Sequence, residues 1–168
     1  MSIPSQLQRL ADGIGAAVGL ASGGMERGIR AALQEATTGE RWLPLERRRA
    51  NHERYARHLL YGDPAGRYSI LAIVWDHGQM SPVHAHYCWC AVGVYQGLLS
   101  ESYYREAAAG GVPVLVSTTR RAAGTLSFDP ASSGIHRIAN DGGATAISLH
   151  VYGVASQRIT TGVNRIYA

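Results

Sequence analysis

Residues 68–75 read Tyr68-Ser69-Ile70-Leu71-Ala72-Ile73-Val74-Trp75, and their β-branched and aromatic side chains predict a β-strand. The pattern continues toward the C-terminus in strand-like segments over residues 83–97, 98–104, 112–118, 124–128, 134–138, 144–152 and 157–161. Turn residues such as Asp129-Pro130 and Asp141-Gly142-Gly143 separate these segments. Short strands at regular spacing predict a sandwich or a barrel, and a small β-barrel fits the length.

Upstream of this strand the apolar residues follow a helical period. The spacing is kept first by Leu7, Leu10, Ile14 and Val18, and again by Met25, Ile29 and Leu33. We expect helices within residues 5–38, interrupted at Gly23-Gly24, and a loop with a short helix in residues 40–57. These helices are expected to cover a sheet. The prediction is one domain over residues 1–168, with a helical segment at 1–57 and a β-barrel at 58–168.

Composition narrows the class of protein. The chain has 168 residues, of which 46% are hydrophobic and 17% are charged, which excludes disorder as the overall state. No apolar run approaches the ~20 residues that span a bilayer, so we expect neither a membrane partner nor a secretory leader. The two cysteines, Cys88 and Cys90, do not suit a disulfide-stapled secreted scaffold. A reducing cytoplasm is therefore the expected location.

The basic residues are unusual in kind. All 16 are arginine, and ten of them precede Tyr68, including the run Arg47-Arg48-Arg49. Such a run could contact nucleic acid or an acidic surface. The interleaving of aromatic and basic residues that marks an RNA-binding strand is absent, and the net charge is only +4. We therefore interpret the run as a solvated loop or helix face and expect no nucleic-acid partner.

The histidines form the first candidate site. In a strand, His84 and His86 point to one face, close enough to bind a single metal ion. A third ligand must come from another strand, and His136, which follows Gly134 and opens a strand, is the best candidate. Three neutral imidazoles suit Fe, Zn, Cu, Mn or Ni. Taken alone, the His84–His86 pair is equally compatible with ordinary surface or core histidines.

A second group lies further along the chain. Ser148, His150 and Tyr152 alternate with Leu149 and Val151, so they share one face of a strand. A hydroxyl, an imidazole and a phenol on one face can form a hydrogen-bonded chain that relays protons. The alternative is a half-polar strand that faces water. Tyr152 follows His136 by 16 residues, so a hairpin could return it to the metal.

The surroundings of the histidines resemble the two cupin motifs. Gly78 precedes His84 by six residues, Gly97 follows His86 by eleven, and further motif positions are Gly124, Pro130, His136 and Asn140. The resemblance implies a double-stranded β-helix barrel with a metal ion in its mouth. Cupins usually place a glutamate ligand four residues after the second histidine, and Cys90 occupies that place.

Within the cupins the chain resembles the thiol dioxygenases, the cysteine dioxygenase family, from about Tyr55 to Tyr152. The matching pieces are Tyr55-Ala56-Arg57-His58-Leu59, Trp75, Ser81-Pro82-Val83-His84-Ala85-His86, Gly97, Gly134-Ile135-His136-Arg137-Ile138-Ala139-Asn140 and Ser148-Leu149-His150-Val151-Tyr152. Family members are often monomeric. The resemblance implies an Fe(II) enzyme that adds both atoms of O2 to the sulfur of a small thiol carboxylate.

The resemblance also implies residue roles. His84, His86 and His136 match the three histidines that hold the iron, and Ser148, His150 and Tyr152 match a catalytic triad beside it. Arg57 matches the residue that pairs with the substrate carboxylate. Cys90 matches the cysteine that is cross-linked to the tyrosine, here Tyr152, in animal enzymes.

The substrate is less sharply indicated. Arg57 favours L-cysteine, whose catabolism begins with oxidation to cysteine sulfinate, or mercaptosuccinate, for which Arg67 or Arg165 could supply a second cation. Enzymes acting on 3-mercaptopropionate commonly carry glutamine at the place of Arg57 and glycine at that of Cys90. However, the spacing from His84 to Gly97 and the ending Val151-Tyr152-Gly153 look closer to those bacterial enzymes.

Other functions stay open at this point. The family usually has aspartate between the paired histidines, and this chain has Ala85, which favours a non-catalytic metal- or ligand-binding cupin. A cupin isomerase is a weaker alternative, because the triad has no obvious use there. Among the remaining residues, Trp75, Trp89 and Cys88 are expected to pack in the barrel, His77 to lie in a turn, and His52 and His58 to be exposed. Tyr61 is a candidate for the pocket entrance.

Overall fold

The computed structural model describes residues 4–107, 111–131 and 134–167. Two helices open the chain, and nearly all that follows is strand. In chain order the elements are α1 (Ser5–Ala17), α2 (Ser22–Thr38), the short 3-10 helix η1 (Leu45–Arg47), β1 (Ala56–Gly62), β2 (Ser69–Trp75), β3 (His84–His86), β4 (Cys90–Gln96), β5 (Leu98–Arg105), β6 (Val114–Ala122), β7 (Leu126–Asp129), β8 (Ile135–Ala139), β9 (Ala146–Tyr152), η3 (Ser156–Arg158) and β10 (Asn164–Ile166).

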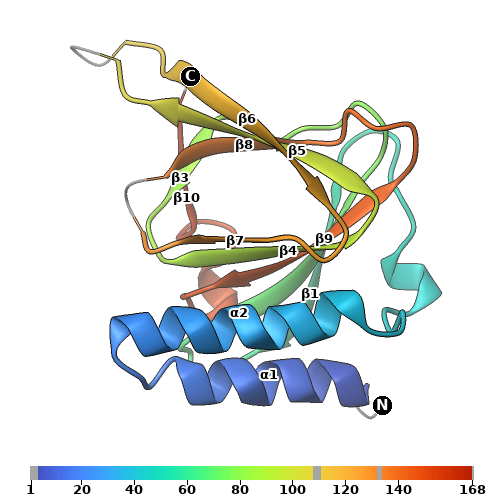
Figure 1. Cartoon of the computed structure of the whole chain (residues 1–168), viewed down its shortest axis with the longest axis vertical. Helices are drawn as coiled ribbons and strands as arrows, with labels where there is room; N and C mark the ends of the chain where they lie inside the picture. The colour runs from blue at the N-terminus through green and yellow to red at the C-terminus, as the bar shows by residue number, and fades with distance from the viewer. Residues whose placement is uncertain (1–3, 108–110, 132–133, 168) are drawn as a thin grey trace.

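The strands form two antiparallel sheets that face each other (Figure 1). One sheet has the order β1-β2-β9-β4-β7, and the other has the order β10-β3-β8-β5-β6. The predicted mainly β barrel with helices outside it is therefore confirmed. The chain passes repeatedly between the sheets, so residues distant in sequence meet in the barrel interior.

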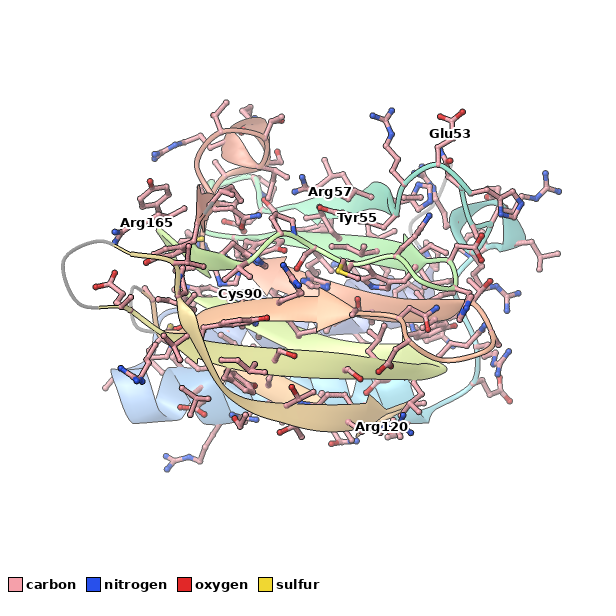
Figure 2. All side chains as sticks on the ribbon, turned by 90° about the horizontal axis from the view of Figure 1, so that it is seen from above. Glu53, Tyr55, Arg57, Cys90, Arg120 and Arg165 are labelled. Atoms are coloured by element: carbon pink, nitrogen blue, oxygen red, sulfur yellow. The ribbon has the colours of Figure 1, made fainter. Side chains whose placement is uncertain are left out.

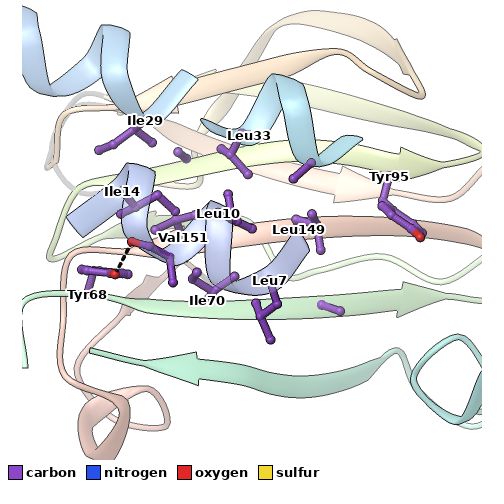
Figure 3. Packing of buried hydrophobic residues seen from close by; sticks show 14 of the residues in the cluster. Leu7, Leu10, Ile14, Ile29, Leu33, Tyr68, Ile70, Tyr95, Leu149 and Val151 are labelled. Atoms are coloured by element: carbon purple, nitrogen blue, oxygen red, sulfur yellow. Dashed lines mark hydrogen bonds between the residues drawn. The ribbon is translucent and has the colours of Figure 1, made fainter. Parts of the chain in front are cut away.

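Helices α1 and α2 lie side by side against the outer face of the first sheet (Figure 1). Their apolar positions pack on side chains from β2 and β9, in a cluster that includes Leu10, Ile14, Ile29, Leu33, Ile70, Leu149 and Val151 (Figure 3). The Tyr68 hydroxyl donates to the Ala11 carbonyl at 2.7 Å and ties α1 to the sheet. Among the described residues, no helix combines the length and apolar character that crossing a membrane would take.

The break between the helices lies at residues 18–21, not at Gly23-Gly24 as the sequence predicts. The carbonyl of Ala21 accepts hydrogen bonds from the amides of Gly24 and Met25, so both glycines fall in the first turn of α2. Glycine costs a helix only about 1 kcal/mol relative to alanine. Burial of the apolar face of α2, which includes Ile29 and Leu33, outweighs that cost.

Two of the strand predictions are wrong in detail, and one strand was not predicted. Residues 83–97 are two strands, because the chain crosses from the second sheet at β3 to the first at β4. Residues 157–161 hold the end of η3 and a turn, and the C-terminal strand is β10 instead. β1 begins at Ala56 and was missed as a strand, since it lies at a sheet edge and its residues are only partly buried or exposed.

Two residues of the cupin motifs, Gly97 and Asn140, shape turns between strands. Gly97 joins β4 to β5 with a φ of +82°, and a Cβ atom there would lie 3.0 Å from the Cα of Ala146. Glycine alone fits such a position without strain. The side-chain amide of Asn140 donates to the carbonyls of Trp75 and Ala144, at 2.9 Å each. These turns fix where β5 and β9 begin and so position the residues inside the barrel.

Candidate metal centre

Three buried imidazoles converge inside the barrel. His84 and His86 come from β3 and His136 from β8, and one nitrogen of each lies within 4.8 Å of the others. His84 and His136 are direct partners across the two strands, so their side chains share a face. The structure thus brings together the three ligands that the sequence predicts, and this cluster could bind a metal ion.

The other ring nitrogen of each histidine already has a partner. Nδ1 of His84 is 2.9 Å from the carbonyl oxygen of Pro82, Nδ1 of His136 is 2.9 Å from Glu101 Oε1, and Nδ1 of His86 is 3.4 Å from Asp129 Oδ2. Such contacts orient metal-binding histidines and leave Nε2 for the ion. Nε2 of His136 is buried and has no hydrogen-bond partner in the described part of the chain. The donor set therefore fits a metal ion.

The electrostatics favour the metal-binding form of these rings. Burial, with the neighbouring imidazoles, lowers the pKa of His84 to about 3, and burial also lowers the pKa of His86. Both rings are therefore neutral near pH 7, and a neutral imidazole is the form that binds metals.

Glu101, which the sequence analysis missed, contacts His136 on the side of the ring away from the three-histidine site. Burial would raise the pKa of Glu101, but the hydrogen bond from His136 and the neighbouring positive charge hold it at about 2. Arg121 Nε donates to Oε2 at 3.0 Å, and the Ser127 hydroxyl donates to Oε1 at 3.3 Å. Arg121 also donates to the Tyr103 hydroxyl at 2.8 Å. The carboxylate is fixed at both oxygens and in turn fixes the His136 ring.

The Ser148, His150 and Tyr152 side chains form a continuous hydrogen-bonded chain. Ser148 Oγ lies 2.8 Å from His150 Nε2, and the Tyr152 hydroxyl lies 3.1 Å from His150 Nδ1. All three residues are buried. The Tyr152 ring centre is 5.7 Å from that of His86, so the hydrogen-bonded chain ends beside the three histidines.

Trp75 sets the direction in which the groups of this hydrogen-bonded chain donate. Its indole Nε1 donates to Ser148 Oγ at 2.9 Å. Within the described residues the Ser148 hydroxyl has no acceptor other than His150 Nε2, so its proton points there. Burial lowers the pKa of His150 well below its usual value, so the ring is neutral and Nδ1 carries its proton. Nδ1 then donates to the Tyr152 oxygen, and the Tyr152 proton is free to point at the cavity.

Cys90 lies directly opposite Tyr152 in the pairing of β4 with β9. Directly opposite side chains in an antiparallel pair have Cβ atoms about 4.5–5.5 Å apart. Burial raises the pKa of the Cys90 thiol well above its usual value, so it stays protonated near pH 7. The Cys90–Tyr152 thioether stays a prediction, which this register supports.

Arg57 stands at the mouth of the cavity above the histidines. On β1 it is the partner of Ile73, whose side chain packs inside the barrel. Arg57 is exposed, and Figure 2 shows it beside Tyr55. The cavity is lined by Tyr55, Arg57, Ile73, Trp75, Ser81, His84, His86, His136, Ile138, His150, Tyr152 and Asn164. In the described chain the arginines in ion pairs are Arg9, Arg30, Arg67, Arg121 and Arg165, and Arg57 is not among them.

Other predicted neighbours of the site lie elsewhere. Arg67 pairs with Asp63 beside the helices, and Arg165 lies 3.5 Å from Glu106 at the surface, so neither lines the cavity. The prediction for Tyr61 is wrong, because its ring stacks on Tyr68 in the layer between the helices and the sheet.

The remaining single-residue predictions have mixed outcomes. Trp75 is buried as expected but also anchors the hydrogen-bonded chain, whereas Trp89 packs on Phe128 in the helix-side layer. Cys88 packs against the barrel interior. His77 lies in a turn and His52 is exposed, as predicted, but His58 is partly buried.

Comparison with known proteins adds a family and a fold. Residues 36–161 match the family described as cysteine dioxygenase type I. A conserved protein with a double-stranded β-helix domain from Klebsiella pneumoniae is similar in structure, with a TM-score of 0.53 and 15% identity over 77% of this chain and 99% of that one. A cupin superfamily protein from Desulfitobacterium hafniense has a TM-score of 0.52 and 16% identity over 70% of this chain and 94% of that one. At these identities the two structures show the cupin fold.

Proposed function

Because the chain belongs to the cysteine dioxygenase type I family, we propose that it is an Fe(II)-dependent thiol dioxygenase. The reaction is R–SH + O2 → R–SO2H, in which the sulfur is oxidised, dioxygen is reduced and no further co-reactant is needed. The preferred substrate is L-cysteine and the product cysteine sulfinate. The observation that carries the proposal is the convergence of His84, His86 and His136 beside the ring of Tyr152.

Iron held by His84, His86 and His136 would supply the redox chemistry and open positions at which a thiol and dioxygen meet. The neutral rings and the carboxylate of Glu101 suit a divalent cation. The three histidines and Tyr152 are buried, which would limit the contact of the sulfur with bulk water.

Arg57 would hold the substrate by its carboxylate. A guanidinium can bind a carboxylate through two parallel hydrogen bonds, which fixes the orientation of the thiol. The absence of an ion pair with a described protein carboxylate leaves Arg57 available for that contact. Arg67 and Arg165 lie away from the cavity, which favours a monocarboxylate over mercaptosuccinate.

Tyr152 would act on the reacting atoms as a hydrogen-bond donor. The chain from Trp75 through Ser148 and His150 orients its hydroxyl proton toward the cavity. A preoriented donor in a buried site stabilises developing negative charge without reorganising during the reaction.

The case for a non-catalytic cupin rested on Ala85. In the structure Ala85 is buried and is the strand partner of Arg165. It lies on the face of β3 opposite to His84 and His86. The carboxylates that orient the metal histidines come instead from Glu101 and Asp129. The alanine therefore removes no hydrogen bond from His86 or His136.

A substrate panel tests the proposal. The iron-loaded protein is given cysteine, 3-mercaptopropionate and mercaptosuccinate in separate oxygen-electrode runs, and the products are identified by mass. We expect cysteine-dependent oxygen uptake with one O2 consumed per sulfinate formed. Oxygen uptake with 3-mercaptopropionate alone would contradict cysteine as the substrate, and no uptake with any thiol would contradict the enzyme itself.

A further inference from the structure

The C-terminal strand contributes a residue to the cavity that lies outside the matched part of the chain. β10 pairs with β3, and Asn164 is the direct partner of His86. Directly opposite residues in an antiparallel pair point to the same face. The side chain of Asn164 therefore points with His86 into the cavity that it lines. The family match ends at residue 161, three residues earlier.

The amide oxygen of Asn164 has no partner. In the described part of the chain, the buried side-chain polar atoms without a hydrogen bond are Arg48 Nε, His58 Nε2, His136 Nε2, Arg137 Nε and Asn164 Oδ1. Of these residues, His136 and Asn164 line the cavity. Buried acceptors in folded proteins are nearly always hydrogen-bonded. An occupant of the cavity should therefore bring a donor to Asn164, as a metal ion would satisfy His136.

The chemistry of the proposed substrate identifies that donor. A thiolate and a carboxylate carry no N–H group, and their partners are the histidine cluster and Arg57. An amino group has N–H bonds to donate whether it is charged or neutral. We propose that Asn164 recognises the amino group of the substrate and so selects amino thiols of the cysteine class over thiols without an amino group. This inference rests on the proposed function and extends it to specificity.

The selectivity has a simple physical origin. A thiol without the amino group enters the same cavity but leaves the Asn164 oxygen buried and unpaired. Sites built to bond a substrate N–H discriminate against analogues that lack it, because the unpaired protein group must be desolvated without compensation.

Binding measured without oxygen gives the selectivity between the two kinds of thiol in the absence of turnover. Isothermal titration of the iron-loaded wild type and of Asn164→Leu is carried out with cysteine and with 3-mercaptopropionate. Leucine keeps the shape of asparagine and removes its acceptor. We expect the wild type to bind cysteine more tightly, and the variant to bind cysteine about tenfold more weakly, as for the loss of one hydrogen bond to a buried group. Binding of 3-mercaptopropionate should change less than about twofold.

Two further variants serve as controls. Asn164→Asp keeps an acceptor oxygen and should retain the preference for cysteine. Arg165→Gln changes the neighbouring residue, whose side chain contacts Glu106 outside the cavity, and should bind both thiols as the wild type does. Iron content is measured on every sample.

The results separate the specificity from the enzyme activity. Equal weakening of both thiols, no weakening of either, or loss of iron in Asn164→Leu would each overturn the role of Asn164. A wild type that binds 3-mercaptopropionate as tightly as cysteine would also overturn it. Absence of oxygen uptake with every thiol would refute the proposed function, whatever the binding data show for Asn164.

Discussion

The two faces of β9 are both buried, but one packs against the helices and the other carries the hydrogen-bonded chain of the site. Ile147, Leu149 and Val151 point toward the helices and belong to the helix-side core. Ser148, His150 and Tyr152 alternate with them and point into the barrel. One face is held by packing, which has no directional requirement, whereas the other depends on partners at defined distances and angles. Burial alone therefore does not distinguish stability from chemistry, and the alternation along one strand does.

The largest expected effect is on stability at the helix-side face. Leu149→Ala removes a fully buried side chain between β9 and the helices, and we expect a loss of about 3 kcal/mol in the free energy of unfolding. Iron content and kcat of the folded protein should stay near wild type. Chemical denaturation and kinetics on the same samples check this. A kcat that falls as strongly as the stability would mean that the two faces are not separable.

On the barrel-side face the expected effect is on turnover. Tyr152→Phe removes the hydroxyl at the end of the hydrogen-bonded chain and should lower kcat about 100-fold, in the range for the loss of one preoriented donor. Stability should change by no more than about 1 kcal/mol. Steady-state kinetics, thermal unfolding and iron analysis give the three readouts. If the variant loses its iron, the tyrosine is a metal ligand rather than a donor.

Glu101→Gln tests the contact between Glu101 and the metal-site histidine His136. Loss of the carboxylate that fixes His136 should weaken iron binding about 10- to 100-fold, measured by competition with a chelator. Glu106→Gln, a surface glutamate near Arg165, is the matched control and should bind iron normally. Equal iron affinity in both variants would show that Glu101 has no part in holding the metal.

The smallest effect per residue is that of pH, and we expect it from the buried histidines inside the barrel. Burial lowers the pKa values of His84, His86 and His150 in the folded protein, whereas in the unfolded chain they titrate near 6.5. The unfolded state therefore takes up more protons as pH falls below 6.5, and the folded state is destabilised until the pH reaches the folded pKa, about 3 for His84.

His84, whose folded pKa is about 3, should cost the metal-free protein up to about 1 kcal/mol of stability between pH 7 and 6. The lowered pKa values of His86 and His150 act in the same direction and add to that loss. Urea unfolding of the metal-free protein at the two pH values measures the sum. Stability that is unchanged, or higher at pH 6, would show that the rings are not buried in the neutral form.

The sequence predicted what depends on local spacing. The period of two places His84 with His86, and Ser148 with His150 and Tyr152, and the structure has both sets on single faces. It did not predict the partners that come from other strands. Glu101 and Asp129 meet their histidines across 35 and 43 residues, and Trp75 meets Ser148 across 73. No local pattern encodes such pairs, although a glutamate within a predicted strand is an observable signal.

The errors in secondary structure have the same origin. The helix break and the C-terminal strand were misplaced because tertiary packing overrides weak local preferences. Asn164 was missed for this reason too, since β10 is short and is defined by its pairing with β3.

Iron and oxygen analysis of the wild type and of His136→Ala tests the central claim most directly. The wild type should hold one iron per chain and consume one O2 for each cysteine sulfinate formed. His136→Ala should lose both the iron and the oxygen uptake, since it removes a ligand that no other described residue replaces. A variant that binds iron and oxidises cysteine like the wild type would contradict the assignment of the metal centre.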